Sequence, residues 1–189
     1  MRLKLPKWMI EFTGHIKFSQ YPMWMQYKPK LHSVKGYQVR KILEILEPGD
    51  ILLRRNALYL NTLFMPYWGH AGLYIGDNKV IHSLGQGVIK EDILDFCRTD
   101  SISVQRITNM EELDALVKQS IKFAEEKLGS EYDFEFELGN NKYSCTELIN
   151  SCYPFIFKDD YEEVMGNLVI TPKGIYNSKA TESILEFRN

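Results

Sequence analysis

The stretch HAGLYIGDNKVIHSLGQGVIKE, residues 70–91, constrains the fold more than any other part of the chain. Two runs rich in β-branched and aromatic residues flank Gly76-Asp77-Asn78, a combination typical of a hairpin turn. Gly85-Gln86-Gly87 marks a second turn, and the sequence after it starts a further short strand. The stretch therefore predicts a hairpin followed by one more strand.

The other predicted elements do not alternate regularly between strand and helix. Further strands are predicted at 49–56 and 101–107. Helices are predicted at 36–46, 91–98, 109–129 and 145–153, with Asn109 as the cap of the third and a short helix within 170–178. Residues 132–141 are expected to form a loop or an edge strand, and residues 1–35 and most of the tail to be irregular. This order predicts an α+β fold with a largely antiparallel sheet.

Composition limits the classes of function. The net charge is −2 and the pI is near 6.1, so bulk charge gives no indication of a nucleic-acid partner. Three cysteines at 97, 145 and 152 match no zinc or disulfide spacing and favour free thiols. The apolar run near the N-terminus is interrupted by polar residues, so neither a signal peptide nor a membrane span is expected. These features predict a cytoplasmic protein.

The length of 189 residues suffices for one domain with a proper core and an appendage. Residues 1–47 are expected to form an N-terminal arm and a short helix that pack on the domain. Residues 48–189 are expected to form the domain itself. The sequence leaves the oligomeric state open.

Two of the four histidines, His70 and His82, lie on the two strands of the predicted hairpin. Alternate residues of a strand point to opposite faces, so the length of the connecting loop decides whether these histidines meet. With a three-residue loop, Gly72 lies opposite His82 and His70 becomes its diagonal neighbour, about 7–8 Å away. With a two-residue Asp77-Asn78 loop, the histidines point to opposite faces. Asp and Asn both tolerate left-handed backbone, so a longer loop with a bulge is compatible with the sequence.

Cys145 occupies the first turn of the helix predicted from residue 145. Helical spacing puts it on one apolar face with Leu148, Ile149 and Cys152, and this face is expected to turn towards the core. Free N–H groups and the helix dipole at a helix start lower the pKa of a thiol, because they stabilise the thiolate. Cys152 lies two turns further along and lacks this assistance. Cys145 is therefore a candidate nucleophile.

Together these residues suggest a cysteine hydrolase in which Cys145 attacks, His70 transfers its proton and His82 orients His70. Each residue could instead have a purely structural role, because free cysteines are mostly buried and strand histidines are mostly hydrogen-bonded. A metal site made of the same three residues is less favoured, since neither HExxH nor CxxC is present. Glu147 is expected to belong to a solvated surface.

Five segments, in this order, resemble the circularly permuted papain-like hydrolases of the NlpC superfamily, in particular the YaeF/YiiX-type branch. They are PGDILLRR (48–55), WGHAGLYIGDNKVIHS (68–83), YDFEFEL (132–138), YSCTELI (143–149) and ITPKGIYNS (170–178). In ordinary papain-like enzymes the cysteine helix precedes the histidine strand, whereas in this sequence the cysteine helix comes after the histidine strand. The resemblance implies Cys145 as nucleophile, His70 as general base and His82 as the third polar residue. It also implies a small barrel-like antiparallel sheet packed against the cysteine helix.

The leading functional hypothesis is hydrolysis of an amide bond in a peptide, for example a cell-wall-type peptide, without any metal or organic cofactor. An alternative is a lipid thioesterase or acyltransferase of the lecithin:retinol-acyltransferase-like type. In that case LYLNTLFMPYW (58–68) and YPMWMQY (21–27) would line an acyl groove. A third possibility is a catalytically silent domain that binds a peptide.

Overall fold

The computed structural model describes residues 16–18, 25–27, 33–55, 67–108, 112–136, 139–164 and 166–188. The chain divides into two compact units, Met1–His32 and Ser33–Asn189. In the first, a short antiparallel pair is described, β1 (Ile16–Phe18) with β2 (Met25–Tyr27). The domain boundary predicted near residue 48 stays a prediction.

The second unit is built around a six-stranded sheet in the order β10-β7-β3-β4-β5-β6, in which all neighbouring strands are antiparallel. Its strands are β3 (Ile51–Arg55), β4 (His70–Gly76), β5 (Lys79–Leu84), β6 (Gly87–Asp92), β7 (Ser101–Ile107) and β10 (Thr181–Phe187). The α+β fold with an antiparallel sheet is thereby confirmed. The sheet is open, with β10 and β6 as its edges, so the barrel-like form implied by resemblance is not reached.

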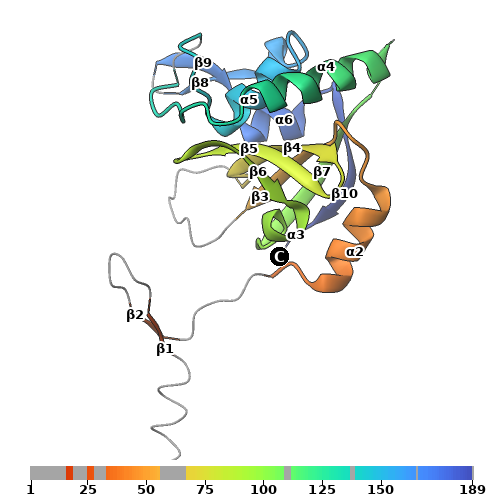
Figure 1. Cartoon of the computed structure of the whole chain (residues 1–189), viewed down its shortest axis with the longest axis vertical. Coiled ribbons are helices and arrows are strands. Elements are labelled where there is room, and N and C mark those ends of the chain that lie inside the picture. Colours follow the sequence, from red (N-terminus) through yellow and green to blue (C-terminus); the bar gives the residue numbers. More distant parts are fainter. Residues whose placement is uncertain are drawn as a thin grey trace, which may run out of the picture. The chain divides into compact units, whose positions relative to one another are not determined.

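Helices cover both faces of this sheet (Figure 1). One face packs against α4 (Leu113–Glu126), α5 (Cys145–Cys152) and α6 (Pro172–Asn177). The other packs against α2 (Gly36–Ile45) and α3 (Ile93–Phe96). Because side chains alternate along each strand, the two faces give two hydrophobic cores. One is centred on Leu53, Leu73 and Ile81, and the other on Leu52 and Val80.

The turn between β4 and β5 combines both loop forms that the sequence allows. Asp77 and Asn78 form a two-residue turn with φ of 49° and 56°, the left-handed backbone of a type I′ hairpin. The register also shifts within β4, since Tyr74 pairs with Val80 whereas Gly76 pairs with Lys79. This bulge adds one residue to β4. Beyond the bulge, side chains of β4 and β5 therefore share the faces that a three-residue loop would give them.

The Gly49-Asp50 turn before β3 is held by buried polar contacts. Arg106 Nε donates to Asp50 Oδ1 over 2.8 Å, and Arg106 Nη2 donates to Asp50 Oδ2 over 2.8 Å. The Tyr153 hydroxyl donates to the Gly49 carbonyl over 2.7 Å. Gly49 has φ +99°, and a Cβ there would lie 2.7 Å from a Val117 methyl carbon. The turn thus needs glycine, and it ties the start of β3 to the end of α5.

Two predictions about local structure are wrong. The tail was expected to be mostly irregular, yet it holds β8 (Tyr161–Val164), β9 (Asn167–Ile170) and β10. Strand β10 is an edge strand with mostly half-buried residues, so its pattern lacks the regular alternation of a one-sided strand. The helix expected from Asn109 starts later: α4 begins at Leu113, and its N-cap is Glu112, whose φ is 62°. Asn109 itself lies outside the described residues.

No helix in the described part of the chain is long and apolar enough to cross a membrane.

Candidate active site

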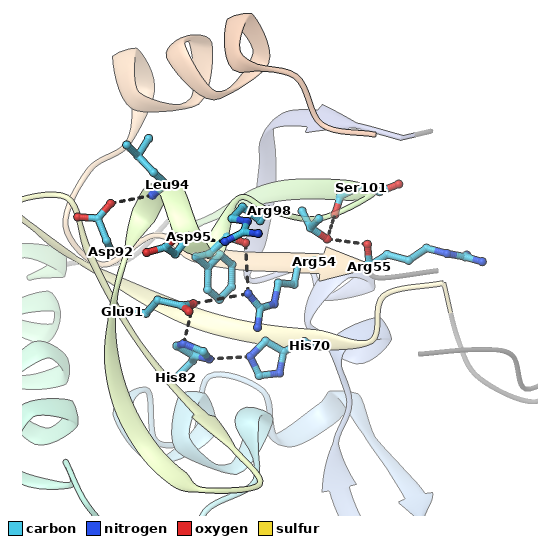
Figure 2. Close-up of polar contacts among 12 residues, drawn as sticks. Arg54, Arg55, His70, His82, Glu91, Asp92, Leu94, Asp95, Arg98 and Ser101 are labelled. Atoms are coloured by element: carbon cyan, nitrogen blue, oxygen red, sulfur yellow. Dashed lines mark hydrogen bonds and ion pairs between the residues drawn. The ribbon is translucent and has the colours of Figure 1, made fainter. Parts of the chain in front are cut away.

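His70 and His82 lie on the same face of the sheet and contact each other (Figure 2). His70 Nε2 is 2.9 Å from His82 Nδ1, and the two rings meet edge to face with centroids 5.1 Å apart. The bulge in β4 produces this arrangement by bringing Gly72 opposite His82. A Cβ on Gly72 would lie 2.7 Å from a Val80 methyl carbon and 2.8 Å from the Phe96 ring, so this approach of the strands requires glycine.

The histidine pair lies in a mostly apolar environment beneath α3. The Phe96 ring packs against both, with centroid distances of 6.0 Å to His70 and 5.2 Å to His82. The Arg54 guanidinium lies 4.3 Å from the centre of the same Phe96 ring. Burial, then the Arg54 charge, lowers the pKa of His82 to about 3. Burial, Arg54 and His82 lower the pKa of His70 well below 6.5. Both rings are therefore neutral near pH 7.

Cys145 is the first residue of α5, as the sequence predicts. Ser144 caps the helix: its hydroxyl accepts from Glu147 N over 3.3 Å, and Glu147 Oε2 accepts from Ser144 N over 2.8 Å. This reciprocal capping box explains why a helix starts here. It also buries Glu147, which is 4% exposed, so the prediction that Glu147 lies on a solvated surface is wrong.

The sulfur of Cys145 lies beside strand β4. The backbone N–H groups of Ala71, the residue directly after His70, of Thr146 and of Cys145 itself act on the thiol. These donors lower the pKa of the thiol, but burial raises it more strongly, and the net pKa is raised. The N–H groups at the helix start do lower the pKa of the thiol, as predicted. The predicted net lowering is wrong, because desolvation raises the pKa by more.

The start of α5 is tied to the strand that carries His82. Ser83 Oγ donates to the Tyr143 carbonyl over 2.6 Å, and Tyr143 N donates to the Glu131 carbonyl over 3.0 Å. Ser83 and His82 are neighbours in the chain and point to opposite faces of β5. One short piece of strand therefore positions the histidine pair on one face and the cysteine helix on the other.

Three residues near the site were missed by the sequence analysis. Arg54 pairs with His70 across β3 and β4, so strand register was the signal that could have found it. Glu91 of β6 lies 3.1 Å from His82 through Oε2 and Nε2 (Figure 2). Phe96 supplies the apolar cover described above. Long-range strand pairing brings Arg54 and Glu91 to the histidines, and no local motif marks them.

The sequence segments proposed for an acyl groove are mostly outside the described residues. Of 58–68 and 21–27, the structure describes only Tyr67, Trp68 and the backbone of Met25–Tyr27. Trp68 is buried and its ring lies 5.7 Å from that of Tyr176. In the part of the chain described, no group of three or more His, Cys, Asp or Glu side chains is arranged to hold a metal ion.

In this chain the hairpin with the two histidines precedes the helix that starts with the buried Cys145. This order, on an antiparallel sheet, is that of a papain-like protein with permuted elements. The sequence matches, over residues 45–185, the family described as permuted papain-like amidase enzyme, YaeF/YiiX, C92. The chain belongs to this family, and it is a cysteine hydrolase of the amide-cleaving kind.

One solved structure shows the likeness in fold. The crystal structure of metalloprotein yiiX from Escherichia coli O157:H7 superposes with a TM-score of 0.60 at 15% sequence identity. The match covers 76% of this chain and 98% of that one. At this identity the comparison supports the fold alone. A search of curated proteins found no match in sequence.

The buried His82 predicts that acid destabilises the fold. His82 stays neutral in the folded state down to about pH 3, whereas in the unfolded chain it binds a proton below about pH 6.5. The unfolded state then binds more protons, so the free energy of unfolding falls by about 1.4 kcal/mol per pH unit below pH 6.5 from His82 alone. Urea denaturation at pH 7, 6 and 5 measures this slope.

The variant His82→Gln isolates that contribution, because glutamine does not titrate. Its unfolding free energy should depend less steeply on pH than that of the natural protein, by about the same 1.4 kcal/mol per pH unit. Glu147, whose pKa burial raises and which does not contact His82, opposes the histidine effect equally in both proteins. Parallel slopes for the two proteins would show that His82 binds its proton in the folded state over the same pH range as in the unfolded chain.

Proposed function

We propose that the protein hydrolyses an amide bond in a peptide, with Cys145 as nucleophile, His70 as general base and His82 as the residue that orients His70. One observation carries the assignment. The backbone N–H of Ala71, next to His70, is near enough to the Cys145 thiol to lower its pKa, and His70 Nε2 lies 2.9 Å from His82 Nδ1. The thiol is thus near the residue that follows the proposed base in β4, and this supports the assignment.

The reaction starts from a neutral thiol and a neutral imidazole, because burial raises the pKa of Cys145 and lowers that of His70. Since Nε2 of His70 is directed to His82, Nδ1 is the ring nitrogen left to take the thiol proton. The sulfur attacks the carbonyl carbon as that proton moves to Nδ1. First-turn N–H groups of α5, which have no acceptor within the helix, stabilise the oxyanion.

Breakdown of this intermediate releases the amine. The imidazolium of His70 gives its proton to the leaving nitrogen, and the C–N bond breaks to leave a thioester on Cys145. Water then attacks the thioester while His70 takes a proton from it, and the acid leaves with the thiol restored. A peptide, including a cell-wall-type peptide, supplies the amide in this proposal.

Iodoacetamide labelling tests whether Cys145 is the activated thiol. Burial raises the pKa of both Cys97 and Cys152 to about 12, and neither has the backbone N–H groups that lower the pKa of Cys145. At pH 7.5 we expect Cys145 to be labelled at least about tenfold faster, because its neighbouring N–H groups favour the thiolate and the other two cysteines lack them. Peptide mapping of samples quenched over time measures the three rates separately.

The variant His70→Ala separates activation from simple exposure. It should slow labelling of Cys145 about tenfold or more while Cys97 and Cys152 keep their rates. Equal, slow labelling of all three cysteines would contradict the enzyme and favour a silent peptide-binding domain. A panel of peptide amides and acyl thioesters, compared by kcat/KM, then distinguishes peptide from lipid chemistry.

A further inference from the structure

The second nitrogen of His82 is directed at an acidic side chain that the proposed mechanism does not use. His82 is completely buried, and its Nε2 lies 3.1 Å from Glu91 Oε2. The contact is bent, and neither atom makes a well-aligned hydrogen bond among the described residues. A buried ring nitrogen without a partner costs about 1–3 kcal/mol. The half-buried Glu91 carboxylate is therefore the group placed to satisfy it.

Glu91 is in turn held by Arg54. Arg54 Nη1 is 3.6 Å from Glu91 Oε2 and donates to the Phe96 carbonyl over 3.2 Å. The two side chains are largely withdrawn from water, with exposures of 11% for Arg54 and 26% for Glu91. An ion pair at this depth is screened less than a surface pair. Arg54 therefore favours the ionised form of Glu91 and keeps it beside His82.

The order of contacts fixes which nitrogen of each ring carries the proton. A carboxylate only accepts hydrogen bonds, so His82 must carry its proton on Nε2 to satisfy Glu91. His82 Nδ1 is then an acceptor, and the nitrogen facing it, His70 Nε2, must be the donor. His70 Nδ1 is left unprotonated. That is the state a base needs in order to take a proton from the Cys145 thiol.

We propose that Glu91, held by Arg54, is a positioning residue that sets the tautomer of His82 and through it the tautomer of His70. This inference rests on the proposed function for its catalytic meaning, but the tautomers themselves can be observed without any substrate. Besides His82, four charged groups act on Glu91: Arg54, its chain neighbour Asp92, Asp95 and Arg98.

The first test is NMR of the natural protein with ¹⁵N-labelled histidine. Long-range ¹H–¹⁵N spectra at pH 7.5, assigned with His70→Gln and His82→Gln, distinguish the two neutral tautomers. We expect both rings to carry the proton on Nε2. A proton on Nδ1 of His82 or of His70 in the natural protein would overturn the inference directly, whatever the activity.

The second test is Glu91→Gln, which keeps the shape and removes the charge. The glutamine amide can donate to His82 Nε2, which would move the proton of His82 to Nδ1 and that of His70 to Nδ1 as well. We expect both shifts in the spectrum and a fall of about 10-fold or more in the iodoacetamide rate at Cys145. Loss of the correct tautomer in a related triad costs up to about 10⁴-fold in kcat.

Asp92→Asn is the matched control, because it removes the same charge from the neighbouring residue. Asp92 caps α3 by accepting from Leu94 N over 3.0 Å and pairs with Lys79 at 3.0 Å, away from the histidines. Asparagine caps a helix about as well as aspartate. This variant should keep both tautomers and the labelling rate.

Three outcomes separate this inference from the proposed function. If Cys145 is labelled rapidly but Glu91→Gln changes neither tautomer nor rate, the role of Glu91 is wrong and the hydrolase proposal stands. The role of Glu91 is also wrong if Asp92→Asn slows labelling as much as Glu91→Gln. If the tautomers shift as expected but Cys145 never reacts faster than Cys97, the proposed function fails and the positioning by Glu91 stands.

Discussion

Replacement of Cys145 by alanine is expected to abolish amide hydrolysis, lowering kcat by at least about 10⁴-fold. No other described cysteine can replace it, because Cys97 and Cys152 are buried in the cores and burial raises the pKa of each to about 12. The change removes one sulfur atom from a site that is 8% exposed, so we expect the fold to persist. Initial rates on a peptide amide, with circular dichroism to confirm folding, measure the effect.

Cys152→Ala is the matched control for this experiment. Cys152 lies on the same helix, two turns further along, and is 3% exposed. Its truncation creates a small cavity and should lower stability by about 1 kcal/mol, with kcat unchanged. Cys145→Ser adds a second measurement, because it keeps a hydroxyl at the site, yet a weaker nucleophile should leave little activity. Activity of Cys145→Ala within tenfold of the natural protein would rule out a covalent intermediate on this residue.

Replacement of His70 by alanine is expected to have the next largest effect, a fall of about 10³-fold in kcat. The thiol of Cys145 is protonated in the resting enzyme, since burial raises its pKa, so attack needs a base at the moment of reaction. His82 is not expected to take over, because its ring is completely buried and its Nε2 faces Glu91. Single-turnover measurements of thioester formation would locate the loss in the first step.

Added imidazole provides the control for His70→Ala. His70 is only partly buried, so the space left by its ring is open to a small base from solvent. We expect imidazole to restore part of the activity in His70→Ala and none in Cys145→Ala. If His70→Ala keeps more than a tenth of the natural kcat, the general base must be another group.

Most of the architecture could be predicted because its signals are local. Gly76-Asp77-Asn78 marks the hairpin, Pro154 follows the end of α5, and Thr171-Pro172 starts α6 with a capping hydroxyl and a proline in the first turn. Strand β10 was missed because an edge strand with half-buried residues lacks a clear alternation. Its pairing with β7, 74 to 85 residues earlier in the chain, is a property of the whole sheet.

The candidate site was predictable only in part, for the same reason. Cys145, His70 and His82 each carry a local signal, namely a helix start and two positions on one hairpin. Arg54 and Glu91 carry none, since they reach the histidines through pairing of β3 with β4 and of β5 with β6. Their roles depend on distances that strand register sets, and a linear pattern does not contain them.

The sequence by itself determined that a cysteine starts a capped helix and that two histidines share a hairpin, because turns, caps and side-chain alternation act over a few residues. It left open whether the histidines meet, and the bulge beside Gly76 decided that they do. The tertiary structure also decided the charge of the site. Burial and the Arg54 guanidinium act through space, and they leave the thiol and both imidazoles neutral where the helix start alone predicts a thiolate.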